Sequence, residues 1–203
     1  MGLWKGAVTA RRYRVVGQVP QGWREAWRER LDAMAFREPT GTTGKEELEG
    51  WVQIHNLLDT SFSRMDRWLY DPFAVFALRV DKKTLPAKLF SATVEKRCEA
   101  WCAERGTEKV PAAVKREIKE QLEEEWLARA LPRVTLVEVS WNVRDGWALV
   151  GTTSEKACDR VRTRFHRTFG LELQPWSPLD FVEDAGTRSS LVASGPSAFG
   201  GEA

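Results

Sequence analysis

An alternation of apolar and polar side chains runs through residues 133–143 and constrains the fold more than any other feature of the chain. Because successive side chains of a strand point to opposite faces, this pattern predicts a strand with one buried face. Asp145-Gly146 supplies the positive φ of a tight turn, and residues 147–150 return as a second strand. One set of positions carries Thr135, Val137, Val139, Trp141 and Val143, and the other carries Glu138, Ser140 and Asn142.

Further strands and one helix are expected around this pair. Residues 6–16, 73–80 and 171–173 have strand character. Trp23, Trp27, Leu31 and Met34 recur at helical spacing and predict a helix that ends before Pro39. Residues 45–72 leave the structure open: 51–54 fit a short strand, and 62–70 fit either a helical turn or a packed loop.

Residues 86–130 have a helical pattern that Gly106 and Pro111 interrupt. Two antiparallel helices follow, and they form a hairpin that projects from the sheet. The charges of this segment balance, with nine basic and nine acidic residues. Basic side chains gather only at the bend, where ordinary solvation is favoured over a DNA contact: Arg105, Lys109, Lys115 and Arg116.

These elements predict an α+β fold, with antiparallel sheet packed against helices and a projecting charged helical hairpin. Residues 1–85 and 131–183 form the mixed body, and 86–130 form the hairpin tip. The segment 184–203 is rich in Gly and Ser, so we expect it to be disordered. With 42% hydrophobic residues, the chain can bury one substantial core or two small ones.

A basic stripe marks the helix that follows the strand pair. Thr152 and Glu155 have the spacing of a capping box, and the helix runs to about Phe169. At 100° per residue four cations share one face, which suits a phosphate backbone and equally suits a solvated surface. Since the net charge is only +2, any DNA affinity must come from such local clustering. The stripe consists of Lys156, Arg160, Arg164 and Arg167.

Catalytic and cofactor chemistry finds little support in the sequence. Cys98 and Cys102 fall in an apolar helical stripe, so we interpret them as buried structural thiols rather than metal ligands. No carboxylate cluster for Mg²⁺ and no phosphate-binding glycine loop is visible. We predict no catalysis, metal or cofactor. With no signal peptide or membrane span and an odd number of cysteines, we expect a cytoplasmic protein.

A series of short motifs spans roughly residues 3–182. They are Lys5, Tyr13-Arg14, Leu31 to Phe36, Trp51-Val52, Leu85-Pro86, Leu131-Pro132-Arg133, Ser154-Glu155-Lys156-Ala157 and Pro178-Leu179. Their order and spacing together resemble the RdgC family of recombination-associated proteins. The likeness is to a short form that lacks the family's C-terminal part, and Val134-Thr135 stands where the family often has an aromatic residue at its dimer contact.

Members of the family form dimers that close around double-stranded DNA. For this chain the resemblance implies a nucleoid-associated homodimer that binds double-stranded DNA with little sequence preference and antagonises the RecA recombinase. The residues expected to contact phosphates are Lys5, Arg12, Arg14, Arg133 and the stripe on the helix that opens at Thr152. An alternative stays open, in which the fold is kept but serves as a protein-protein interaction module.

Overall fold

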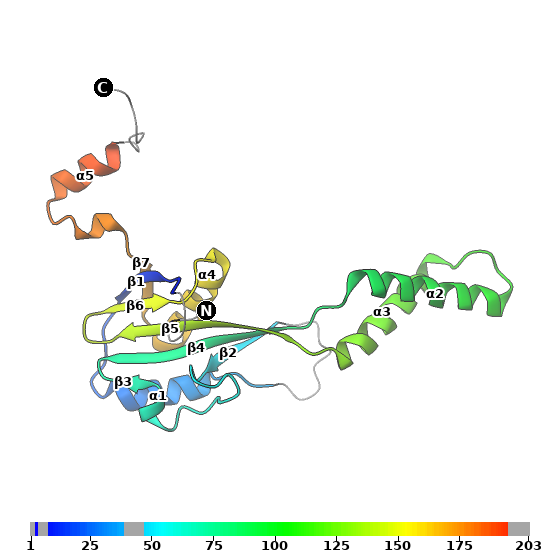
Figure 1. Ribbon diagram of the computed structural model, residues 1–203, viewed down its shortest axis with the longest axis horizontal. Coiled ribbons are helices and arrows are strands. Elements are labelled where there is room, and N and C mark those ends of the chain that lie inside the picture. The colour runs from blue at the N-terminus through cyan, green and yellow to red at the C-terminus, as the bar shows by residue number, and fades with distance from the viewer. Residues whose placement is uncertain (1–2, 4–7, 39–46, 195–203) are drawn as a thin grey trace.

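The computed structural model describes residues 3, 8–38 and 47–194, and within them it has an α+β fold built on one antiparallel sheet (Figure 1). The strands are β1 (Arg11–Val16), β2 (Leu48–Val52), β3 (Leu69–Tyr70), β4 (Phe73–Lys82), β5 (Arg133–Asn142), β6 (Trp147–Val150) and β7 (Glu172–Pro175). The helices are α1 (Trp23–Ala33), α2 (Ala87–Arg105), α3 (Ala112–Arg129), α4 (Glu155–Phe169) and α5 (Ala185–Ala193), with 3₁₀ turns η1 (Met65–Arg67) and η2 (Pro178–Phe181). The predicted fold class is confirmed.

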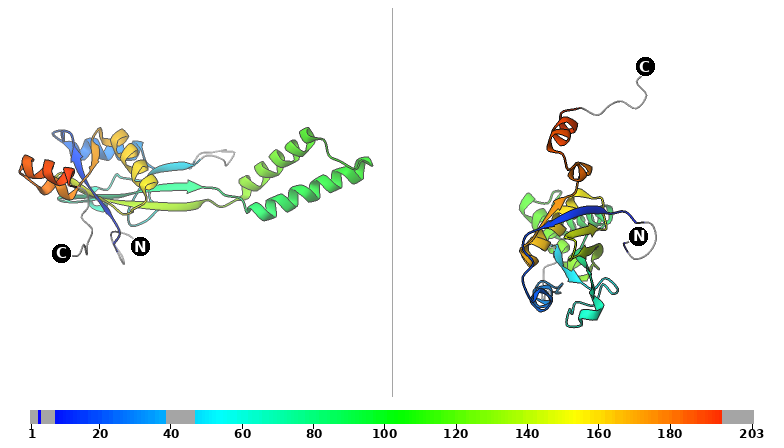
Figure 2. Two further views of the ribbon diagram at one scale, coloured as in Figure 1. Left: turned by 90° about the horizontal axis from the view of Figure 1, so that it is seen from above. Right: turned by 90° about the vertical axis from the view of Figure 1, so that its left-hand side faces the viewer.

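The strand order is β2-β4-β5-β6-β1-β7, and β3 pairs separately with β4. β4 and β5 pair along their whole length, from Phe73 opposite Asn142 to Lys82 opposite Arg133. β6 pairs with β5 only from Val139 onward, whereas β2 accompanies β4 as far as Asp81, so the two long strands run past β6 toward the hairpin. Helices α1 and α4 cover the same face, called the inner face here, as the view from above shows (Figure 2).

The core lies between this inner face and the two helices. Trp141 of β5 meets Trp27 of α1 at 4.4 Å between ring centroids and Phe165 of α4 at 5.0 Å. The predicted alternation is therefore correct in its centre, since Val137, Val139 and Trp141 are all buried. Its first position is different, since Thr135 is exposed.

Residues 34–36 cross the edge of β2 and cover part of the opposite, outer face. Phe36 N–H donates to Trp51 O at 2.9 Å, and a Cβ on Gly50 would come within 2.3 Å of Phe36 Cα, so only glycine fits there. On this side Arg79 and Asp81 form a buried pair at 2.6 Å. The sheet edge at β2 is thereby closed by the chain itself.

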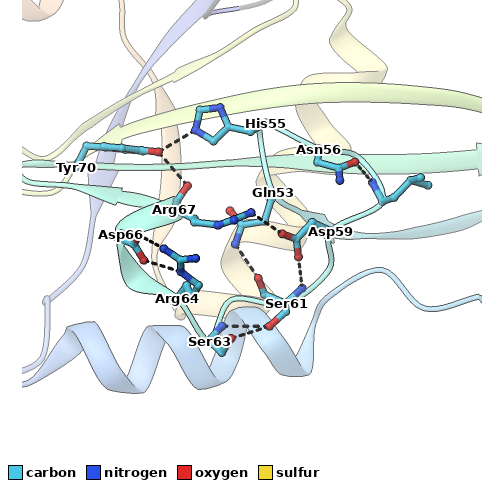
Figure 3. Close-up of polar contacts among 11 residues, drawn as sticks. Gln53, His55, Asn56, Asp59, Ser61, Ser63, Arg64, Asp66, Arg67 and Tyr70 are labelled. Carbon is cyan, nitrogen blue, oxygen red and sulfur yellow. Dashed lines mark hydrogen bonds and ion pairs between the residues drawn. The ribbon is translucent and has the colours of Figure 1, made fainter.

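Residues 53–68, part of the segment 45–72 that the sequence left open, connect β2 to β3 as a loop that contains the helical turn η1, and polar contacts hold this connection in place (Figure 3). Gln53 Nε2 donates to Ser61 O at 2.7 Å, and Gln53 N–H donates to Asp59 O at 2.9 Å. Phe62 and Trp68 are fully buried beneath it. These local hydrogen bonds, rather than a periodic apolar face, determine its path.

Helices α2 and α3 form the projecting hairpin (Figure 1). Phe90 and Trp126 pack at 5.6 Å, Arg97 pairs with Glu125 at 2.7 Å, and Leu122 is fully buried. Cys98 and Cys102 are half-buried, so their interpretation as buried thiols is wrong for this thin two-helix element. Pairs of helices without a third layer leave much of each apolar stripe partly exposed.

Two local predictions near the C-terminal half are also wrong. The residue before α4 is Ser154 rather than Thr152, and its side chain makes no capping hydrogen bond; Thr152 Oγ1 instead accepts from Ser154 N–H at 3.2 Å. Residues 185–193 were expected to be disordered, but they form α5, because Asp184 caps the helix by accepting from Thr187 N–H. Residues 195–203 of the predicted tail lie outside the described residues.

Candidate nucleic-acid interface

The basic residues that the sequence singled out fall on opposite faces of the sheet. Tyr13 of β1 is buried on the inner face, so its neighbours Arg12 and Arg14 point to the outer face. Arg133, at the start of β5, lies on the inner side together with α4. Lys5 lies outside the described residues. The predicted set therefore does not form one continuous surface on a single chain.

The four cations of the α4 stripe have different surroundings. The stripe consists of Lys156, Arg160, Arg164 and Arg167. Arg164 points inward: its Nη2 donates to Met34 O at 3.1 Å and to Glu49 O at 3.0 Å. Only 15% of its side chain is exposed, and burial lowers the pKa of its guanidinium. Arg164 thus joins α4 to β2 and to the connection between α1 and β2, and little of its side chain is left exposed for a phosphate.

Arg160 is held by two carboxylates, one from Glu47 just before β2 and one from Glu49 within β2. It forms an ion pair with Glu47, and its Nη1 lies 3.9 Å from Glu49 Oε2. Glu47 also accepts from Lys82 Nζ at 2.7 Å. Hydrogen bonds from Lys82 and then from Arg160 lower the pKa of Glu47 from 4.5 to about 2, so this carboxylate stays ionised at neutral pH.

Arg133, Lys156 and Arg167 are the predicted cations on this side that remain exposed. Within the described ranges none of the three has an ion pair with a carboxylate. Lys156 and Arg167 lie along the open side of α4 and line one shallow groove with Arg160, a groove that the carboxylates of Glu47, Glu49 and Asp159 also line. These three side chains are free to meet an external anion.

A hollow of about 280 Å³ opens beside them, between the first turn of α4 and the ends of β4 and β5 nearest the hairpin. We call it the basic hollow. Its floor is apolar, with Leu78, Val80, Val137 and Ala157, and its rim is polar. The rim residues are Glu47, Lys82, Arg133, Thr135, Ser154, Lys156 and Arg160.

Lys82 is a rim residue that the sequence did not single out. The run Asp81-Lys82-Lys83 indicated the end of a strand, and its register opposite Arg133 could not be known before β4 and β5 were paired. The sequence did contain a signal, because Lys82 lies two positions after one predicted strand and Arg133 begins the next.

On the outer face Arg12 is stacked between aromatic rings. Its guanidinium carbon lies 4.8 Å from the centroid of Trp147 and 4.0 Å from that of Trp176, and Trp176 stacks in turn on Phe181 at 5.2 Å. Arg14 lies 5.8 Å from Trp176. This stack fixes the chain that follows β7 to the sheet, so the immediate role of Arg12 is structural.

The bend of the hairpin is mixed rather than basic. Arg105 stacks on Trp101 at 4.5 Å. Lys109 and Lys115 line a surface depression together with Glu95, Glu99 and Glu108. Arg116 is exposed on α3. The acidic neighbours weaken the field that the sequence suggested here.

In the described part of the chain, no three His, Cys, Asp or Glu side chains form a group that could hold a metal ion. None of the helices described is long and apolar enough to cross a membrane.

A family model matches residues 10–187 of this chain. Its description is "RdgC: Putative exonuclease, RdgC". The match covers the sheet, both inner-face helices and the hairpin. No curated protein matches the sequence.

Proposed function

The chain belongs to the RdgC family, and on this premise we propose that it binds double-stranded DNA without reading its sequence and thereby modulates recombination or replication. The proposed role is binding without catalysis. We include in the proposal a homodimer that acts on nucleoid DNA and limits access of the RecA recombinase.

The observation that carries this proposal is the set of exposed cations on the inner side: Arg133, Lys156 and Arg167. They lie on two rigid elements, the start of β5 and the solvent side of α4. Lys and Arg side chains that contact phosphates give affinity and position without sequence information. We assign the duplex to this side, and not to the outer face with Arg12 and Arg14.

The test is a triple variant, Arg133→Ala/Lys156→Ala/Arg167→Ala, titrated into a labelled duplex of scrambled sequence. Each lost phosphate contact flattens the slope of log affinity against log salt by about 0.9. Between about 50 mM and 200 mM salt, three contacts account for roughly a forty-fold fall in affinity that the variant lacks. Fluorescence anisotropy at both salt concentrations measures it.

The matched control is Lys88→Ala/Lys96→Ala/Lys119→Ala. It removes the same charge from exposed positions of the hairpin, so it corrects for the change in net charge. If the slope of log affinity against log salt changes equally in both variants, the DNA surface does not include these positions of α4 and β5.

A second candidate is a protein-protein interaction module. Its support is apolar surface away from the core: Phe181 is 63% exposed, Leu136 is 40% exposed, and α5 has no buried residue and stands off the sheet (Figure 1). Absence of duplex affinity at low salt, together with self-association or a protein partner in solution, would favour this candidate.

A further inference from the structure

The basic hollow has features that a duplex backbone does not use. Phosphate contacts along a duplex need exposed cations on a convex or shallow surface, whereas the basic hollow is recessed and has an apolar floor of Leu78, Val80, Val137 and Ala157. Its volume of about 280 Å³ lies near the lower end for small-ligand sites. A base-paired duplex is too wide to enter it, but a single nucleotide is of the right size.

The charges on the rim indicate which polar group a ligand would carry. Lys82 and Arg160 already share Glu47, while Arg133 and Lys156 have no carboxylate partner within the described ranges. Two unpaired cations balance a phosphomonoester dianion better than a single carboxylate. Ser154, whose side chain makes no capping hydrogen bond, adds a hydroxyl donor at the positive end of α4.

The floor defines the rest of the ligand. A sugar phosphate would cover these apolar side chains with hydroxyl groups and lose hydration, and a phospholipid is too large for the volume. We propose that the basic hollow binds a nucleotide with a terminal phosphate, with the phosphate between Arg133 and Lys156 and the base and sugar over the apolar floor. The nucleotide is either free or the phosphorylated end of a DNA strand. The inference goes beyond the proposed function, because it requires no affinity for the duplex backbone.

Glu47 gives this site a selectivity among phosphates. Its ionised carboxylate is fixed on the rim by Lys82 and Arg160. A second or third phosphate would extend along the same rim toward this negative charge. The site therefore prefers a monophosphate to a triphosphate, and Glu47→Gln reduces the preference.

Isothermal titration of the full chain with AMP, adenosine and inorganic phosphate tests the ligand class. We expect AMP to bind and each fragment to bind at least about ten-fold more weakly, a difference of about 1.4 kcal/mol. The absence of AMP binding up to about 1 mM overturns the inference. Inorganic phosphate that binds as tightly as AMP also overturns it, since the apolar floor then contributes nothing.

Thr135→Phe separates this site from the duplex surface. Thr135 is exposed on β5 and lines the hollow, and Phe suits a strand, so the variant fills the cavity and keeps all the cations. We expect AMP binding to fall at least about ten-fold while duplex affinity at low salt stays within about two-fold. Unchanged AMP binding in Thr135→Phe contradicts the assignment. If duplex affinity falls together with AMP binding, the hollow is part of the duplex surface and the separate nucleotide site is overturned. If the unmodified chain binds AMP but no duplex at low salt, the proposed function fails and this inference stands.

A competition experiment distinguishes a free nucleotide from the phosphorylated end of a DNA strand. It measures the binding of single-stranded oligonucleotides with and without a 5′-phosphate, each in competition with AMP. A preference for the phosphorylated strand that AMP and Thr135→Phe both remove supports a strand end. AMP binding without that preference supports a free nucleotide. A preference that Thr135→Phe leaves intact places the strand end elsewhere and contradicts the inference for DNA ends.

Discussion

Replacing Arg164 separates the structural part of the α4 stripe from its DNA-facing part. Arg164 and Arg167 are three positions apart on one helix, and a helical projection cannot distinguish them. In the structure Arg164 makes two hydrogen bonds to main-chain carbonyls of Met34 and Glu49, whereas Arg167 is exposed. Arg164→Ala should therefore destabilise the fold, and Arg167→Ala should weaken DNA binding without affecting stability.

The magnitude follows from those contacts. Loss of the guanidinium removes two charge-assisted hydrogen bonds of about 1.5 kcal/mol or more each and leaves two carbonyls without that donor. Against this, the buried charge itself is unfavourable: burial lowers the pKa of Arg164, and its Nε has no hydrogen-bond partner. We expect a net loss of about 2–3 kcal/mol, equivalent to a Tm about 5–10 °C lower for a chain of this size.

Urea unfolding followed by tryptophan fluorescence measures this difference, with Arg167→Ala as the matched control. The control should lie within about 0.5 kcal/mol of the unmodified chain. If Arg164→Ala is as stable as this control and yet binds DNA more weakly, then Arg164 faces the ligand in solution. The division of the stripe would then be wrong.

Three further predictions concern the basic hollow and the hairpin. Glu47→Gln releases Lys82 and Arg160, so duplex affinity measured by anisotropy should rise at low salt and its salt slope should steepen by up to about 0.9 for each cation that gains a phosphate. The pKa of Glu47 falls from 4.5 to about 2 on folding, so its pairing stabilises the fold fully above pH 4.5, and this stabilisation is lost as the pH falls toward 2. In that pH range the urea midpoint of Glu47→Gln should therefore depend less on pH than the midpoint of the unmodified chain. Leu122→Ala, at a fully buried position between α2 and α3, should cost about 2–4 kcal/mol and increase amide exchange in the hairpin while leaving the sheet protected.

The sheet and its covering helix could be predicted because their side-chain periods are strong and local. Val137, Val139 and Trp141 follow a period of two, and Val161 and Phe165 follow a helical period, so each segment reveals its own buried face. Residues 53–70 have no such period. Hydrogen bonds such as those of Gln53 to Ser61 and Asp59 hold that segment, and these depend on a fold already formed.

The binding residues could be predicted only as a candidate set. The stripe on α4 was visible, but Arg160 and Arg164 are occupied by Glu47 and Glu49, which are more than a hundred positions away in the sequence. Lys82 joins Arg133 only through the full-length pairing of β4 with β5. Helical spacing shows which side chains share a face, and it does not show what lies opposite that face.

This arrangement makes the short segment that carries Glu47 and Glu49 the element that sets the charge of α4. Both carboxylates enter with one edge strand, and they neutralise the middle of the stripe while its ends, Lys156 and Arg167, stay open. Substitution of Glu47 changes the exposed charge of α4 without altering α4 itself, whereas Glu49 also supports Arg164 through its main-chain carbonyl. DNA affinity should therefore respond more strongly to Glu47 than to Arg164, although only Arg164 belongs to the helix that the sequence marks as basic.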